Sequence, residues 1–225
     1  MKKTIVTVLL AMFLLQADAQ NDKEWISLFD GKTISGWHAF KKPGSATAWI
    51  VKDQSIYLDI SKKEGRGDLV TDREFGDFHL KFEWKVAPKS NSGLIFWVKE
   101  GDGFGATYQT GPEFQLIDNT GYPDPLLPVQ KSGSLYDLIA CPSENVKPTG
   151  EWNSSEIVSE KGKLVFIVNG KKVVETVLGS NEWNALIAGS KFAAYKDFAK
   201  TPNGRIALQD HGGEVWYKNI MIKNL

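Results

Sequence analysis

The strongest constraint on the fold is a run of alternating polar and apolar residues near the middle of the chain. A two-residue period is that of a β-strand with one buried face, whereas a helix places every third or fourth residue on the same side. We therefore predict a strand over residues 79–86 whose apolar face contacts a core. Its polar positions are His79, Lys81, Glu83 and Lys85, and its apolar positions are Leu80, Phe82, Trp84 and Val86.

Similar short alternating runs recur along the chain and predict an all-β fold. Regularly spaced strands separated by turns are typical of an antiparallel sandwich, and only residues 182–192 favour a short helix. Asn169-Gly170 favours a type I′ hairpin turn, and we expect 91–99 to be the hairpin partner of 79–86. No repeat or linker divides the chain, so residues 20–225 are expected to form one domain. The other predicted strands are 49–59 (with a turn at 52–54), 68–73, 113–117, 156–159, 163–168, 205–209 and 215–223.

The N-terminus has the order of features of a secretion signal. Residues 1–3 are Met-Lys-Lys, residues 4–15 are apolar, and Ala17-Asp18-Ala19 fits the small-x-small cleavage rule. The apolar run is shorter than the roughly 20 residues that span a bilayer. We predict a signal peptide over 1–19, a mature chain that starts at Gln20, and a periplasmic or secreted location.

Charge and cysteine content narrow the expected partners. Lys and Arg total 27, as do Asp and Glu, so neither nucleic acid nor an anionic membrane surface is an expected partner. Cys141 is the only cysteine, which leaves no lipoprotein cysteine after the signal and no internal disulfide. No later segment is apolar enough to span a membrane. The long segments 101–110 and 119–150 are rich in Gly, Pro and Tyr, and such loops are usually functional.

Two strands carry polar residues suited to chemistry. The predicted strand 113–117 places Glu113 and Gln115 on one face, which fits a sugar-binding or acid/base position or a solvated outer face. A paired-carboxylate glycosidase is not supported by this strand alone, since Gln115 occupies the partner position. The strand that begins at Arg205 places Gln209 and His211 on the same face as Arg205. A histidine there could move a proton near neutral pH or could cap the turn before two glycines.

Read together, an ordered set of segments resembles the 3-keto-disaccharide hydrolase family of bacterial exported proteins, also described as 3-keto-glucoside lyase/hydratase domains. The resemblance covers nearly the whole mature chain, and it departs mildly at Phe114, where the family often has Tyr. The segments are Leu28-Phe29-Asp30-Gly31-Lys32-Thr33 with Gly36-Trp37, 78–86 with 91–96, 113–118, Leu135-Tyr136-Asp137-Leu138, 147–153, Asn169-Gly170 and 206–212.

The resemblance implies a concanavalin A-like jelly roll with a sugar site on a concave sheet face. It also implies an enzyme that cleaves glycosides carrying a ketone at C3, by elimination followed by hydration. Such a route needs one base, a proton for the leaving group and a group that stabilises an enolate. By this reading Glu113 is the catalytic base or acid and His211 its proton-transfer partner. Arg205 and Gln209 would steady the enolate or neighbouring hydroxyls.

Further substrate-binding residues are expected around these four. A divalent metal that polarises the ketone stays open, with no ligand set to name, and no other cofactor is expected. Two alternatives remain: a non-catalytic carbohydrate-binding domain on the same fold, and an ordinary glycosidase with a second carboxylate such as Asp118, Asp137 or Glu83. The expected lining residues are Lys81, Glu83, Gln115, Asn91, Trp97, Tyr136 and Asp137.

Overall fold

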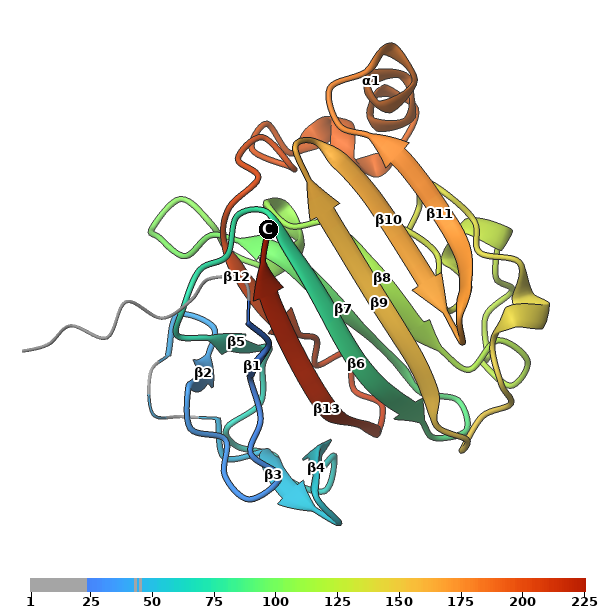
Figure 1. Cartoon of the computed structure of the whole chain (residues 1–225). Coiled ribbons are helices and arrows are strands. Elements are labelled where there is room, and N and C mark those ends of the chain that lie inside the picture. Colours follow the sequence, from blue (N-terminus) through green and yellow to red (C-terminus); the bar gives the residue numbers. More distant parts are fainter. Residues whose placement is uncertain (1–23, 43, 45) are drawn as a thin grey trace, which may run out of the picture.

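Two antiparallel β-sheets are stacked face to face as layers (Figure 1). The structure, a computed structural model, describes residues 24–42, 44 and 46–225, so the predicted signal peptide lies outside the described residues. The larger sheet has eight strands in the order β11-β10-β9-β6-β13-β4-β3, with β1 paired to β13. Its strands are β1 (Ile26–Ser27), β3 (Trp49–Lys52), β4 (Ser55–Leu58), β6 (Phe78–Val86), β9 (Asn153–Glu160), β10 (Lys163–Val168), β11 (Lys171–Val177) and β13 (Val215–Asn224).

The smaller sheet has five strands and carries the two segments that the sequence singled out for chemistry. Its order is β2-β5-β12-β7-β8, all antiparallel. This all-β sandwich of two antiparallel sheets confirms the predicted jelly-roll class. The strands are β2 (Trp37–Ala39), β5 (Leu69–Thr71), β7 (Asn91–Val98), β8 (Glu113–Ile117) and β12 (Arg205–Leu208).

The main core lies between the sheets and contains the apolar side of each alternating strand. Leu80, Phe82 and Trp84 of β6 are at most 2% exposed, as the two-residue period predicts. From the other sheet, Phe114 meets Phe82 edge to face, with ring centroids 5.3 Å apart. Each sheet therefore has an inner face in the core and an outer face that is free to carry polar groups.

The expected hairpin between 79–86 and 91–99 is wrong. Strand β6 pairs with β9 and β13, whereas β7 pairs with β8 and β12 in the other sheet. The chain crosses from one layer to the other through residues 87–90. Alternation determines which face of a strand is buried but not which strand lies beside it, so a short connection between two strands does not by itself distinguish a hairpin from a crossing between sheets.

Helical structure is confined to short segments, and the main one stands at one end of the sandwich, beyond β10 and β11 (Figure 1). The expected helix over 182–192 is shorter, because Gly189 ends it and a separate 3-10 turn follows. Ser180 caps its start by accepting the backbone N–H of Trp183 at 3.1 Å. The segments are α1 (Asn181–Ala188), η1 (Thr107–Gln109), η2 (Pro128–Gln130), η3 (Ser143–Asn145) and η4 (Lys191–Ala194).

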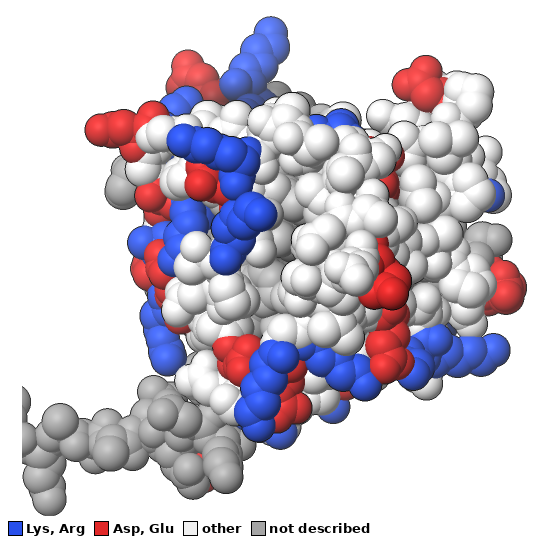
Figure 2. Space-filling view, turned by 90° about the horizontal axis from the view of Figure 1, so that it is seen from above, with Lys and Arg blue, Asp and Glu red and all other residues white. Residues whose placement is uncertain are grey.

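Viewed from the end that carries α1, the surface is mostly uncharged in its middle, and Lys, Arg, Asp and Glu gather towards its edges (Figure 2). Within the part of the chain that the structure describes, no helix has both the length and the apolar character needed to cross a membrane.

Candidate functional site

The outer face of the five-stranded sheet has one continuous row of directly opposed residues. His38 on β2 pairs with Val70, Val70 with Ala207, Ala207 with Ile95, and Ile95 with Glu113 on β8. Directly opposed residues of an antiparallel ladder share a face. Since neighbouring strands lie about 4.8 Å apart, the two polar ends of the row are about 19 Å apart. The face therefore holds two separate polar regions divided by buried apolar side chains.

Glu113 is the buried carboxylic acid of the first region. Its neighbours Phe114 and Leu116 point into the core, so alternation turns Glu113 and Gln115 to the outer face, as predicted. Gly93 on the adjacent strand leaves room for the Glu113 side chain to lean across it. Glu113 is only 6% exposed. Burial raises the pKa of Glu113 to about 8; the charge of Lys191 and a hydrogen bond from Gln209 oppose the rise, and the charge of Asp68 adds to it.

Tyr136 and Lys191 adjoin Glu113 from the irregular part of the chain. The Tyr136 backbone N–H donates to the Glu113 carbonyl oxygen at 3.0 Å. Lys191 Nζ lies 4.3 Å from the centroid of the Tyr136 ring. Burial, then the charge of Glu113, raises the pKa of Tyr136. Sequence reasoning named Tyr136 but missed Lys191, which lies in a 3-10 turn where no alternation indicates a face.

Gln209 brings an unpaired acceptor to the same region, and Asn91, two residues before Gly93 on β7, has another. The Gln209 backbone N–H donates to the Gly93 carbonyl oxygen at 2.9 Å, so its side chain stands beside the glycine that Glu113 leans over. Among the described residues, Gln209 Oε1 and Asn91 Oδ1 are buried and have no hydrogen-bond partner. A buried acceptor without a partner is costly, so both atoms are suited to accept hydroxyl groups of a bound molecule. Gln115 instead folds back, since its Oε1 accepts the backbone N–H of Leu116 at 3.0 Å.

Asp68 is a second buried carboxyl that sequence reasoning did not find. It accepts the Thr107 hydroxyl and, at 2.9 Å, the backbone N–H of Asp210. Burial raises the pKa of Asp68; these two hydrogen bonds oppose the rise, and the charge of His211 opposes it to a smaller extent. Asp210 is itself held by Arg66, whose Nε lies 2.7 Å from Asp210 Oδ2. The structure therefore places the exposed His211 beside Asp68, and among the described residues no contact joins His211 to Glu113.

A buried hydrogen-bond network supports this region from the core side. Tyr217, on β13 of the larger sheet, donates its hydroxyl to the Gly93 carbonyl oxygen at 3.0 Å. The same hydroxyl lies 2.9 Å from Ser92 Oγ, and Ser92 Oγ donates to the Gln209 carbonyl oxygen at 2.7 Å. Ser92 has one hydrogen to donate, so Tyr217 shares its own between Ser92 and Gly93. The backbone beneath Glu113 is thereby fixed by a residue of the opposite sheet.

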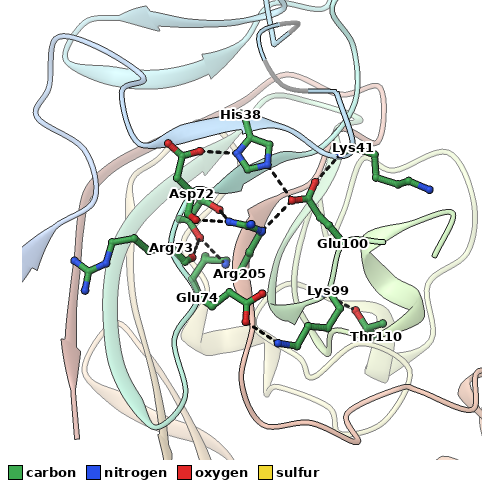
Figure 3. Close-up of polar contacts among 11 residues, drawn as sticks. His38, Lys41, Asp72, Arg73, Glu74, Lys99, Glu100, Thr110 and Arg205 are labelled. Atoms are coloured by element: carbon green, nitrogen blue, oxygen red, sulfur yellow. Dashed lines mark hydrogen bonds and ion pairs between the residues drawn. The ribbon is translucent and has the colours of Figure 1, made fainter. Parts of the chain in front are cut away.

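Arg205 belongs to the second polar region rather than to the Glu113 region. Its Nε lies 2.9 Å from Glu100 Oε2, and its Nη1 donates to the carbonyl oxygens of Thr71 and Asp72 (Figure 3). His38 bridges two carboxylates there, with Nδ1 2.6 Å from Asp72 and Nε2 3.0 Å from Glu100. The expectation that Arg205 acts beside Gln209 is wrong, because its guanidinium group lies against Glu100, Thr71 and Asp72 at the far side of the sheet.

Three other expected lining residues also lie elsewhere. Lys81 and Glu83 are on β6 of the larger sheet, where Lys81 pairs with Glu156 at 3.6 Å and Glu83 accepts from Asn219 at 2.7 Å. They face away from the smaller sheet, because the alternate residues of β6 fill the core. Trp97 is 1% exposed and points into the core. It has a positive φ of 59° at an irregularity of β7, so it and Phe96 both turn inward.

Asp137 directly follows Tyr136, and its backbone N–H donates to the Val129 carbonyl oxygen at 3.0 Å. Asp118, a candidate second carboxylate, instead closes a turn by accepting backbone N–H groups of Lys89 and Gly121. In residues 24–42, 44 and 46–225, no group of three or more His, Cys, Asp or Glu side chains could hold a metal ion.

The whole chain is similar to proteins whose names refer to carbohydrate hydrolysis. A protein of Bacteroides thetaiotaomicron named 3-keto-disaccharide hydrolase is 35% identical over 227 aligned residues, covering 89% of this chain and 78% of that protein. A crystal structure from Parabacteroides distasonis, described provisionally as a glycosyl hydrolase, superposes with a TM-score of 0.83 at 32% identity. That superposition covers 94% of this chain and 98% of the other.

A second Parabacteroides distasonis structure with the same provisional description has a TM-score of 0.67 at 23% identity, over 90% of this chain and 100% of the other, and supports the fold. The family match itself spans residues 24–223, which include every strand of both sheets except the last residue of β13. The chain therefore belongs to the family of 3-keto-alpha-glucoside-1,2-lyase-like domains.

Proposed function

We propose that this protein cleaves glycosides whose sugar carries a ketone at C3, and that Glu113 is the group that transfers the proton at C2. The family and the name of the Bacteroides thetaiotaomicron relative support the substrate class. The observation that carries the proposal is a buried carboxyl with a pKa of about 8 on the outer face of the sheet, beside Gln209, whose amide oxygen is unpaired. A carboxyl so tuned can give and take a proton near neutral pH.

The C3 ketone makes the hydrogen at C2 acidic. Glu113 removes that proton, the C2–H electron pair forms the enolate, and the negative charge moves to the oxygen at C3. The enolate then re-forms the ketone and expels the substituent at C1, which leaves a C1–C2 double bond. The leaving oxygen takes a proton, for which the exposed His211 beside Asp68 is our candidate donor. Addition of water across the double bond gives the free 3-keto sugar.

The raised pKa fits a carboxyl that serves in both directions. With a pKa of about 8, roughly a tenth of Glu113 is ionised at pH 7, which is the fraction able to remove the C2 proton. Once protonated, the acid is stable in its buried position and can return the proton to C2 during hydration. Gln209 Oε1 and Asn91 Oδ1 accept sugar hydroxyls in this scheme, which removes the cost of their burial.

An ordinary glycosidase is a second candidate, and the observation that favours it is Asp68. Asp68 adjoins Asp210 and its charge acts on Glu113, so two carboxyls do share this region. Inverting glycosidases use two carboxyls about 6.5–9.5 Å apart. Both oxygens of Asp68 accept hydrogen bonds from the protein, however, which suits a structural carboxylate better than a base for water.

The deciding experiment offers the purified protein an aryl β- or α-glucoside and the matching 3-keto glucoside. Release of the aryl group from the keto compound alone, and its loss in Glu113→Gln, is the expected result. Cleavage of the unoxidised glucoside, lost in Asp68→Asn as well as in Glu113→Gln, would establish the ordinary glycosidase instead. Binding of both compounds without release from either would make the protein a carbohydrate-binding domain.

A further inference from the structure

We propose that Lys191 is a catalytic residue of this site, whose ammonium group stabilises the negative oxygen that forms at C3 of the sugar. The inference rests on the proposed function, which names no group that stabilises the negative charge on the C3 oxygen. Removal of the C2 proton moves a full negative charge to that oxygen, and enzymes stabilise such charge with preorganised cations or hydrogen-bond donors. The sequence pointed to Arg205 for this role, but Arg205 is bound to Glu100 at the other side of the sheet.

The backbone around Lys191 is held by a capped turn and by core packing. Lys191 begins η4, and Ser190 caps this turn by accepting the Phe192 backbone N–H at 3.2 Å. Phe192 is 1% exposed and stacks on Phe198, with ring centroids 4.0 Å apart and planes 13° from parallel. Just beyond, the Ala199 backbone N–H donates to the Thr110 carbonyl oxygen at 2.8 Å, which ties the segment to the loop before β8. The turn is therefore anchored on both sides.

The exposed ammonium group of Lys191 lies over aromatic rings, one of which belongs to Tyr136, a neighbour of Glu113. Lys191 Nζ lies over the rings of Tyr136 and Phe192, at 4.3 and 5.3 Å from their centroids. Tyr136 is in turn joined to Glu113 through its backbone N–H. Among the described residues Lys191 forms no ion pair, and its charge is the largest favourable one that acts on the Glu113 carboxylate. A cation that rests on aromatic rings keeps its charge available for a bound anion.

The position of Lys191 matters when the C2 proton is removed. The Glu113 carboxylate takes the C2 proton and becomes neutral, while the C2–H electrons pass through the C2–C3 bond to the C3 oxygen. The charge thus moves from Glu113 to the substrate, and the Lys191 ammonium group, already near Glu113, attracts the new anion without losing a proton. When the C1 substituent leaves, the electron pair returns from the C3 oxygen and the attraction ends.

The test measures removal of the C2 proton separately from cleavage of the bond at C1. The probe is the 3-keto derivative of 1,5-anhydroglucitol, which has no leaving group at C1, and the readout is replacement of its C2 hydrogen by deuterium in D2O, followed by NMR. Lys191→Met keeps the aliphatic stem on Tyr136 and removes the charge, and we expect exchange to fall by about 10²- to 10³-fold. Lys191→Arg restores a positive charge and should recover most of the rate. Lys196→Met, an exposed lysine of the same segment, is the matched control and should exchange as the wild type does.

A second readout separates catalysis from a structural role. Because Lys191 lowers the pKa of Glu113, its removal should shift the rise of the exchange rate to higher pH, whereas loosened packing would lower the rate without such a shift. If Lys191→Met exchanges within threefold of the wild type, with an unshifted pH profile, the proposal is wrong while the proposed function stands. If the wild type itself neither exchanges the probe nor cleaves the keto glucoside, the proposed function fails, and this inference fails with it.

Discussion

The carboxyl group of Glu113 occupies the space that a β-carbon on residue 93 would need. A β-carbon built on Gly93 would lie 2.3 Å from Glu113 Oε1 and 2.8 Å from Glu113 Cγ and Cδ. Gly93 is therefore glycine because of its neighbour, since its backbone is not in the left-handed region. The Glu113 carboxyl can occupy this position because residue 93 has no side chain.

Gly93→Ala should displace the Glu113 carboxyl and remove most of the activity, with a stability cost of about 1–3 kcal/mol from the forced contact. Glu113→Ala removes the colliding atoms, so Gly93→Ala should cost much less stability in that background. Urea unfolding of the two single variants and the double variant measures this coupling. Additive stability changes would show that the contact with Glu113 is not what excludes alanine.

Glu113→Gln should stabilise the fold, and increasingly so as pH rises. The folded-state pKa of Glu113, about 8, lies above the ordinary value of 4.5, so the folded protein holds a proton that the unfolded chain releases. Wild-type stability is then fully present below pH 4.5 and is lost as pH rises towards 8. The variant's gain should grow by at most about 1.4 kcal/mol per pH unit across this window. Chemical unfolding at pH 4.5, 6 and 8 checks it; a constant difference would contradict the raised pKa.

Tyr217→Phe should lower both stability and activity without touching the substrate. It leaves the buried carbonyl oxygen of Gly93 with only the Gln209 N–H and takes a donor from Ser92, which costs about 1–3 kcal/mol. Ser92→Ala acts on the same network, so the double variant should cost less than the sum of the two single changes. Tyr57→Phe, on the same sheet, is the control and should spare activity.

Arg205→Met should destabilise the protein but leave the pH dependence of catalysis unchanged. The variant breaks the contact with Glu100 and frees two backbone carbonyl oxygens, at a cost of about 1–3 kcal/mol. Arg205 is not among the charges that act on Glu113. Rates for the keto glucoside between pH 6 and 9 test this, and a displaced profile would return Arg205 to the site.

The sequence predicted features that lie within a single regular strand or turn. The two-residue period of 113–117 assigned Glu113 and Gln115 to one face and Phe114 to the core, and the structure confirms that division. Asn169-Gly170 likewise predicted the turn between β10 and β11, where both residues have positive φ. These features follow from local sterics and burial, which a short window of sequence contains.

The sequence did not predict features that arise where segments distant in the chain meet. No local pattern shows that the chain leaves one sheet for the other between Val86 and Asn91, so the sequence did not show that Lys81 and Glu83 belong to the sheet opposite Glu113. Lys191 and Asp68 reach Glu113 from irregular segments 78 and 45 residues away in the chain. Their positions are set by tertiary packing, which single-sequence periodicity does not record.

The hydrogen bond from Tyr217 to Gly93 makes the distance between the two sheets part of the chemistry. The proposed site lies on one layer, yet the strand that fixes its backbone is the last of the chain and runs through the other layer. A substitution in the core that moves the layers apart by a fraction of an ångström would reposition Glu113 with no residue of the site altered. Selection for a different sugar or leaving group could therefore act on the core residues between the two sheets as well as on the side chains that contact the substrate.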